Sequence, residues 1–169
     1  MLNKAKLYAI KAHGDQLYGD KPYSVHLEHV VTILRNYGET AQVIGYLHDV
    51  VEDTNITIED IEDEFGVFVA DCVSILTDET GDNRKERKTK TYAKMSKVSG
   101  DLELALVVKA ADRLANLQAS SSGDNVRLLN MYKQEHEIFK SSVQREGLAS
   151  DVWKKIEQLV TNYHIGINQ

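Results

Sequence analysis

The sequence predicts an all-α fold on three observations. Only one proline and ten glycines occur in 169 residues. Apolar residues recur at spacings of three and four, which is typical of helices with one buried face. We find no stretch with the alternating polar and apolar pattern of a strand. A chain of this length fits a single domain, residues 1–169, which can bury roughly 70% of its unfolded surface in one core.

Start and stop signals define the first two helices. Residues 2–13 form a first helix that is expected to turn Leu7 and Ile10 inward, and a turn-rich segment follows it. Proline fits only the first turn of a helix, because it lacks an N–H group and clashes deeper inside. Pro22 therefore indicates that a second helix, residues 24–37, begins just after it.

The middle of the chain has three further helices and a charged one. An apolar stripe predicts a helix over residues 39–53. Thr57 resembles a helix cap because acids, which favour the positive end of the helix dipole, follow it in the first turn. The short helix after it stops at Gly66, and residues 67–76 form another apolar helix. A polar loop then leads to a long charged helix, residues 84–98.

The most apolar helix is predicted over residues 101–118. Apolar side chains cover most of its circumference, which places it at the centre of the fold. It nevertheless carries Asp112 and Asn116 one turn apart. Acids are almost never fully buried unless they are paired or bind a metal, so Asp112 requires a partner. Helices over residues 125–144 and 150–163 complete the predicted fold.

The composition argues against several classes of protein. A net charge of -6 disfavours a nucleic-acid partner, because binding phosphate backbones needs a basic surface. We see neither a signal peptide nor the run of about 18 apolar residues that a membrane span needs. The lone Cys72 cannot form an internal disulfide and lies in an apolar run, so we expect a reducing, cytoplasmic environment.

A histidine and three carboxylates lie among apolar residues within the segment 46–55. His48 and Asp49 offer one imidazole nitrogen and one carboxylate oxygen, a ligand set that suits Mn²⁺, Fe²⁺ or Zn²⁺. On a helix, Glu52 lies four residues from His48 and three from Asp49, so Glu52 and Asp53 could face the same centre. Taken alone, this cluster is more often a surface or core-edge pair than a metal site.

Two residues elsewhere favour the metal site. His26 and Asp112 each lie on a helix that must pack in the same core. In this combination the chain resembles the HD-superfamily hydrolase domain of the RelA/SpoT enzymes and, by its length, the small alarmone hydrolases. The resemblance rests on five segments in order, Ala12-His13, Pro22-Tyr23-Ser24-Val25-His26, residues 47–54, Phe65-Gly66 and residues 109–117.

The resemblance implies an all-helical enzyme that binds one Mn²⁺ ion and hydrolyses the 3′-pyrophosphate of the alarmones (p)ppGpp. The residues that would carry these roles are His26, His48, Asp49 and Asp112 as metal ligands, Glu52 and Asp53 at the attacking water, and Asn116 in the nucleotide pocket. The chemistry is consistent with that role. A divalent ion lowers the pKa of a bound water and polarises a phosphoryl oxygen, and a nearby carboxylate can take the water's proton.

Basic residues are concentrated in the segment 84–90, which carries five of the twenty Lys and Arg residues. Such a run is typical of a solvated helix face, but Arg84, Arg87 and Lys88 could instead neutralise the phosphates of a small nucleotide substrate. Arg113, next to Asp112, is interpreted as a salt-bridge partner behind the ligands.

The loop after the first helix departs from the family pattern. (p)ppGpp hydrolases usually carry basic residues just after the segment that corresponds to Ala12-His13-Gly14-Asp15-Gln16, where this chain has Leu17-Tyr18-Gly19-Asp20. Tyr18 could stack on a base in their place, and His13 is interpreted as a structural residue that orients the loop. Two alternatives stay open: hydrolysis of another nucleotide, such as (p)ppApp or a nucleoside monophosphate, and a catalytically silent nucleotide-binding module. The sequence does not predict an oligomeric state.

Overall fold

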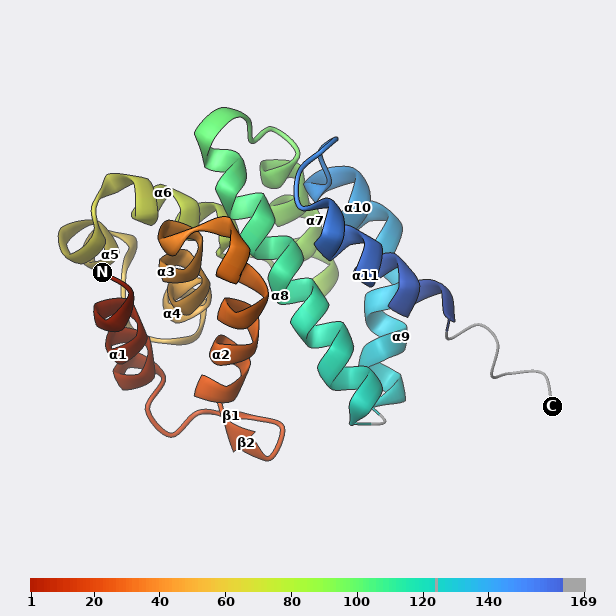
Figure 1. Ribbon diagram of the computed structural model, residues 1–169, viewed down its shortest axis with the longest axis horizontal. Coiled ribbons are helices and arrows are strands. Elements are labelled where there is room, and N and C mark those ends of the chain that lie inside the picture. The colour runs from red at the N-terminus through yellow and green to blue at the C-terminus, as the bar shows by residue number, and fades with distance from the viewer. Residues whose placement is uncertain (124, 163–169) are drawn as a thin grey trace.

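The computed structural model describes residues 1–123 and 125–162 and confirms the all-α class (Figure 1). The helices are α1 Leu2–His13, α2 Ser24–Ile33, α3 Glu39–Leu47, α4 Val50–Asp53, α5 Ile58–Phe65, α6 Val67–Leu76, α7 Arg84–Met95, α8 Glu103–Ser122, α9 Val126–Gln134, α10 His136–Val143 and α11 Ser150–Asn162. Two 3₁₀ turns, η1 Leu34–Tyr37 and η2 Gly100–Leu102, precede α3 and α8. Among the described residues no helix is both long enough and apolar enough to cross a membrane.

Helix α8 lies at the centre of the fold, as its apolar circumference predicts. In Figure 1 it crosses the molecule diagonally, with α1 to α6 on one side and α9 to α11 on the other. It packs against α2, α3 and α6 on the first side and against α9, α10 and α11 on the second. Leu106, Leu114 and Leu117 on α8 are at most 1% exposed. Asp112 therefore projects from the helix against which both halves of the fold pack.

The predicted helix over residues 39–53 is broken at His48 and Asp49, so this prediction was wrong in detail. Asp49 has φ -106° and ψ -2°, which differ from the average α-helical values of about -63° and about -42°, and the short helix α4 begins at the next residue. On an unbroken helix, neighbouring side chains point about 100° apart, because a turn takes 3.6 residues. The break lets both polar side chains turn toward one centre.

The inward face of α1 also differs from the prediction. Leu7 is 67% and Ile10 37% exposed, whereas Ala5 and Ala9 are fully buried and His13 is 7% exposed. These three buried residues are spaced four apart, so they form one stripe on the helix. Small side chains on this stripe let α1 approach α3 closely, and the stripe ends at His13 beside the candidate site.

Other boundaries also differ from the sequence prediction: α2 ends at Ile33 and is followed by η1, and α7 ends at Met95 and not at residue 98. A hairpin, β1 Leu17–Tyr18 paired with β2 Lys21–Pro22, lies in the loop where no strand was expected. The helix predicted over residues 125–144 is two helices that meet at Glu135. Helix α8 starts two residues later and ends four residues later than expected. The expected end of the last helix, Tyr163, lies outside the described residues.

Candidate metal centre

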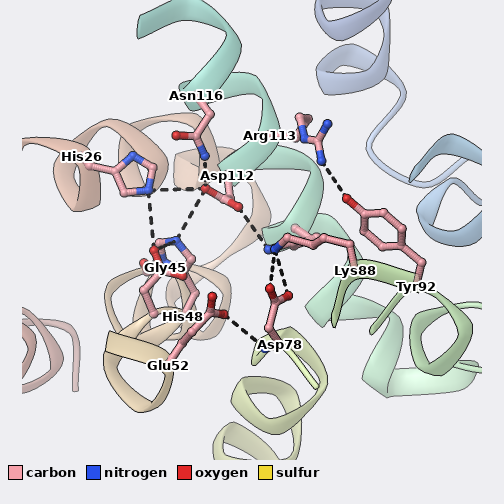
Figure 2. Close-up of polar contacts among 12 residues, drawn as sticks. His26, Gly45, His48, Glu52, Asp78, Lys88, Tyr92, Asp112, Arg113 and Asn116 are labelled. Atoms are coloured by element: carbon pink, nitrogen blue, oxygen red, sulfur yellow. Dashed lines mark hydrogen bonds and ion pairs between the residues drawn. The ribbon is translucent and has the colours of Figure 1, made fainter. Parts of the chain in front are cut away.

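Four polar side chains from three parts of the fold meet at α8, and Figure 2 labels three of them, His26, His48 and Asp112. His26 comes from α2, His48 and Asp49 from the break between α3 and α4, and Asp112 from α8. His26, His48 and Asp112 are 3%, 1% and 8% exposed. His26, His48 and Asp49 each offer a ligand atom within 4.8 Å of the other two, so these residues could share one ion.

Asp112 completes the arrangement from the α8 side. Its Oδ1 atom lies 3.3 Å from Nε2 of His26 and 3.6 Å from Nε2 of His48. Oδ2 of Asp49 lies 2.9 Å from the same nitrogen of His48 and 3.9 Å from that of His26. Two imidazole nitrogens and two carboxylate oxygens therefore converge on one point.

The His48 side chain is oriented for metal binding. Its Nδ1 atom lies 2.8 Å from the carbonyl oxygen of Gly45, so Nδ1 donates its proton there and Nε2 is the nitrogen that faces the carboxylates. Nε2 is buried and makes no hydrogen bond of good geometry among the described residues, although Oδ2 of Asp49 lies 2.9 Å from it. Buried polar atoms are rarely left unpaired. A divalent ion in contact with Nε2 would satisfy this atom, so the residues present fit a metal.

The electrostatics of the four residues are also those of a cation site. Burial disfavours the charged forms of Asp49 and Asp112, but neighbouring positive groups outweigh it and hold the pKa of both carboxyls below their usual range. For Asp49 the largest opposing contribution is the charge of His48, and for Asp112 it is the charge of Lys109. Both acids are therefore ionised near neutral pH, as metal ligands must be.

Further hydrogen bonds hold the carboxylates from outside. The Tyr23 hydroxyl donates to Oδ2 of Asp49. The Asn116 side chain donates to Oδ1 of Asp112 over 2.6 Å and accepts a 2.7 Å bond from the Tyr18 hydroxyl. The Tyr18 ring stacks on His26 with 4.6 Å between the ring centroids. Tyr18 and Asn116 were both predicted to contact the nucleotide. Tyr18 contacts His26 and Asn116 contacts Asp112, so each lies against one of the four converging residues.

A cavity of about 230 Å³ opens over this centre. Its walls combine acids, cations and aromatic rings. The residues that line it are Tyr18, Tyr23, His26, Asp49, Glu52, Asp53, Arg84, Lys88, Lys109, Asp112, Arg113, Asn116 and Tyr132. A larger cavity of about 570 Å³ lies against α10 and α11, but it contains none of the residues that converge on His48.

Glu52 and Asp53 both lie in the cavity wall, at the end of α4. Glu52 accepts a hydrogen bond from the backbone N–H of Asp78 over 3.1 Å, and Asp53 accepts one from the Gln16 side chain over 2.8 Å. Partial burial in the wall raises the pKa of Glu52, and the charge of Lys109 opposes that rise. Both acids therefore line the cavity beside Asp49.

The predicted cations divide into two groups. Arg84 and Lys88 line the cavity, where Arg84 pairs with Glu135 and Lys88 pairs with Asp78 over 2.7 Å. Arg87 is not among the lining residues, so the structure gives no support for its expected contact with substrate. All three residues belong to α7, and the cavity meets only one face of that helix.

Arg113 and Lys109 add two cations to the cavity wall. Arg113 pairs with Glu135 over 3.3 Å, as the salt-bridge interpretation predicted, and donates to the Tyr92 hydroxyl over 2.8 Å. Lys109 is only 6% exposed, and its Nζ atom lies 3.2 Å from Oδ2 of Asp112. Figure 2 shows the contact between Arg113 and Tyr92 and the bond from Asn116 to Asp112.

Sequence reasoning missed Lys109, Tyr23 and Tyr132 as cavity residues. Lys109 had a usable signal, because it is a lysine inside the most apolar helix, three residues before an acid that needs a partner. Tyr23 had a weaker one, since it directly follows Pro22 near a predicted ligand. Tyr132 had none, because its helical spacing is equally typical of a packing residue.

Comparisons with known proteins agree with this geometry. Residues 5–149 match the family model described as HD domain. The chain is 30% identical to a probable guanosine-3′,5′-bis(diphosphate) 3′-pyrophosphohydrolase of Synechocystis and to a GTP pyrophosphokinase of Brucella ovis, over 96% of its own length. It spans only 22% of the length of each of these relatives.

A solved structure gives a whole-chain match. It is described as a metazoan ortholog of SpoT that hydrolyses ppGpp, and it superposes with a TM-score of 0.81 at 26% identity. The superposition covers 99% of this chain and 96% of that one. The family model, the relatives and this fold agree, and the chain belongs to the HD domain family.

Proposed function

We propose that this protein is a metal-dependent phosphohydrolase that removes the 3′-pyrophosphate of guanosine polyphosphate alarmones, with Mn²⁺ as its ion. One observation carries the proposal. The buried Nε2 atom of His48, which makes no hydrogen bond of good geometry, lies beside His26, Asp49 and Asp112, and these three residues line a cavity that also holds two acids and four cations. Such a combination suits hydrolysis of a phosphate ester beside a divalent ion.

In this proposal His26, His48, Asp49 and Asp112 hold the ion. A divalent ion there would supply a water of lowered pKa and an electrophile for a phosphoryl oxygen. Glu52 and Asp53 accept the proton of the attacking water and orient it, and the raised pKa of Glu52 suits a group that takes up a proton near neutral pH. We assign this role to the pair, because each carboxylate is held in the cavity wall by its own hydrogen bond.

The charges of the cavity favour an anionic substrate once the ion is bound. The lining residues include four carboxylates and four Lys or Arg side chains, so their formal charges cancel. A divalent ion would add two positive charges beside these cations, and positive charge in a cavity with low-dielectric walls attracts and holds phosphate groups. Arg84, Lys88 and Lys109 are the proposed phosphate contacts.

Relatives and size support the alarmone as substrate. One curated relative is named a 3′-pyrophosphohydrolase of guanosine bis(diphosphate), and the solved structure that matches the whole chain is described as hydrolysing ppGpp. A single module of this size is present in the latter, since the match covers 96% of that chain. We therefore propose that residues 1–169 act as one catalytic unit on a small nucleotide, not on a nucleic acid or a membrane.

A second candidate is hydrolysis of another nucleotide, such as (p)ppApp or a nucleoside monophosphate, at the same centre. It is favoured by the loop after α1, which lacks the basic residues usual in (p)ppGpp hydrolases. Tyr18 replaces them, but one face of its ring already stacks on His26 and its hydroxyl is bonded to Asn116. The nucleobase is therefore the least constrained part of the proposal.

Product analysis tests the proposed function. The metal-free protein is incubated with Mn²⁺, Fe²⁺ or Zn²⁺ and with ppGpp, pppGpp, ppApp or mononucleotides, and pyrophosphate and phosphate are quantified separately. We expect pyrophosphate from ppGpp with Mn²⁺. Selective turnover of another nucleotide would support the second candidate, and nucleotide binding without any turnover would indicate a silent module.

Two variants separate the metal from the water chemistry. Asp49→Asn should lose both Mn²⁺ retention and turnover, because it removes a ligand charge at the base of the cavity. Glu52→Gln should keep Mn²⁺ and lose turnover, by roughly 10²–10⁴-fold for a general base. Full activity of the Asp49→Asn variant would overturn the assigned site.

A further inference from the structure

A chain of contacts runs from the end of α1 to the acid Asp53. We propose that Gln16 is a positioning residue, which holds the Asp53 carboxylate toward the reacting water and is itself held by His13. This inference rests on the proposed function, since it assigns Asp53 a part in the hydrolytic step. It identifies in Gln16 a determinant of turnover that directly precedes the residues, 17–20, at which this chain departs from the family pattern.

The Gln16 side chain uses both ends of its amide group. Its Oε1 atom lies 2.8 Å from Nδ1 of His13, and its Nε2 atom donates to Oδ2 of Asp53 over 2.8 Å. The reverse amide orientation would place an oxygen against the Asp53 carboxylate, where two acceptors repel. Only one orientation satisfies both contacts, so the amide has a single favourable setting and His13 donates from Nδ1.

His13 gives this amide a rigid support. The His13 side chain is 7% exposed and lies on the buried stripe of α1. Its ring stacks on the Tyr23 ring, with 4.3 Å between centroids and an interplanar angle of 22°. Tyr23 in turn donates its hydroxyl to Asp49. The same group of rings therefore supports a proposed metal ligand and, through Gln16, a proposed water-orienting acid.

The backbone around Gln16 is fixed on both sides. Its N–H donates to the carbonyl of His13 over 3.0 Å, and its own carbonyl accepts from the N–H of Tyr23 over 2.9 Å. The second bond closes the base of the β1–β2 hairpin. The main chain thus fixes the position of residue 16, and His13 holds its side-chain amide.

The Asp53 carboxylate depends on such a partner to hold its orientation. It is exposed and lies at the last position of α4, a helix of a single turn. Gln16 is the one side chain whose hydrogen bond to the Asp53 carboxylate is seen within residues 1–123 and 125–162. Glu52, by contrast, is held by a backbone N–H. Loss of the Gln16 amide therefore frees Asp53 to rotate and leaves Glu52 in place.

The experiment uses Gln16→Met, which keeps the length of the side chain and removes the amide, and Gln16→Glu, which keeps the shape and removes the donor. Both should lower kcat about 10- to 100-fold, the usual effect of removing a supporting contact at a metal site, while KM and Mn²⁺ affinity stay unchanged. Gln118→Met is the matched control, because Gln118 also pairs with a histidine, His29, over 2.8 Å but lies outside the cavity. Its kcat should equal that of the unaltered protein.

A double-mutant cycle distinguishes positioning from general damage. If Gln16 acts through Asp53, adding Gln16→Met to Asp53→Asn should cause no further loss of kcat. An equal loss in both backgrounds, or unchanged kcat in both Gln16 variants, would overturn the proposal. These comparisons use whichever nucleotide the unaltered protein hydrolyses.

A crystal structure of the Gln16→Met variant with Mn²⁺ gives a readout that does not depend on turnover. We expect the Asp53 carboxylate in a new position, with His26, His48 and Asp49 unmoved. An unchanged Asp53 would overturn the proposal even in an active enzyme. A protein that hydrolyses no nucleotide but shows the displaced Asp53 would refute the proposed function and leave the positioning contact established.

Discussion

The buried ion pair between Lys109 and Asp112 offers a stringent test of whether Asp112 faces an ion. Lys109 is 6% and Asp112 8% exposed, and their charged atoms lie 3.2 Å apart. Replacing Lys109 by methionine removes the charge but keeps a long unbranched side chain. In the metal-free protein, Asp112 then loses its closest fixed cation.

The size of the effect follows from the cost of an uncompensated buried charge. Removing one partner of a buried ion pair costs about 3–5 kcal/mol of unfolding free energy. Despite burial, the facing carboxylates raise the pKa of His48, which can therefore hold a proton beside Asp112, and this favours the lower end, about 3 kcal/mol. In a domain of this size that lowers the melting temperature by roughly 6–12 °C. With Mn²⁺ bound, the ion supplies charge at Asp112, so the loss should be clearly smaller.

Thermal unfolding in a chelator and in saturating Mn²⁺ measures both losses. Lys88→Met is the matched control, because Lys88 forms a partly buried pair with Asp78, which is not a proposed ligand. Its loss should be the same with and without Mn²⁺. A Lys109→Met variant that loses equal stability in both conditions would refute the placement of an ion against Asp112.

Three further predictions concern other parts of the structure. A Cβ atom on Gly45 would lie 2.7 Å from Cδ1 of Leu34, so Gly45→Ala should cost about 1–3 kcal/mol in urea unfolding; unchanged stability would contradict this packing. Burial disfavours the charged form of His48, but Asp49 and the other facing carboxylate outweigh it and raise its pKa. His48 must release that proton to bind Mn²⁺, so calorimetry should show affinity rising with pH and proton release on binding; pH-independent affinity would refute it. Burial raises the pKa of Cys72 to about 11, so its thiol should react with a thiol reagent at pH 8 only after unfolding.

The sequence was sufficient for the helical architecture and for the residues that meet at the centre. The decisive residue was Asp112, because an acid in the most apolar helix needs a compensating group. His26, His48 and Asp49 supply the rest, and the structure places all four around one point. Their role as metal ligands is still a prediction, as are the roles of Glu52 and Asp53.

The details that the sequence did not reveal depend on tertiary contacts. The break at Asp49 leaves the apolar pattern of residues 39–53 unchanged, so periodicity cannot detect it. Hydrophobicity favoured Leu7 and Ile10 as the inner face of α1, but close packing of helices selected the alanine stripe instead. Lysines usually extend their charged end to water, so a buried Lys109 was not expected from residue type alone.

The central claim is that one ion lies among His26, His48, Asp49 and Asp112. Anomalous diffraction at the manganese absorption edge, from crystals of the protein grown with Mn²⁺, tests it most directly. We predict a single strong peak in contact with Nε2 of both histidines and with an oxygen of each carboxylate. A peak at another position, or no peak at this one, would contradict the claim.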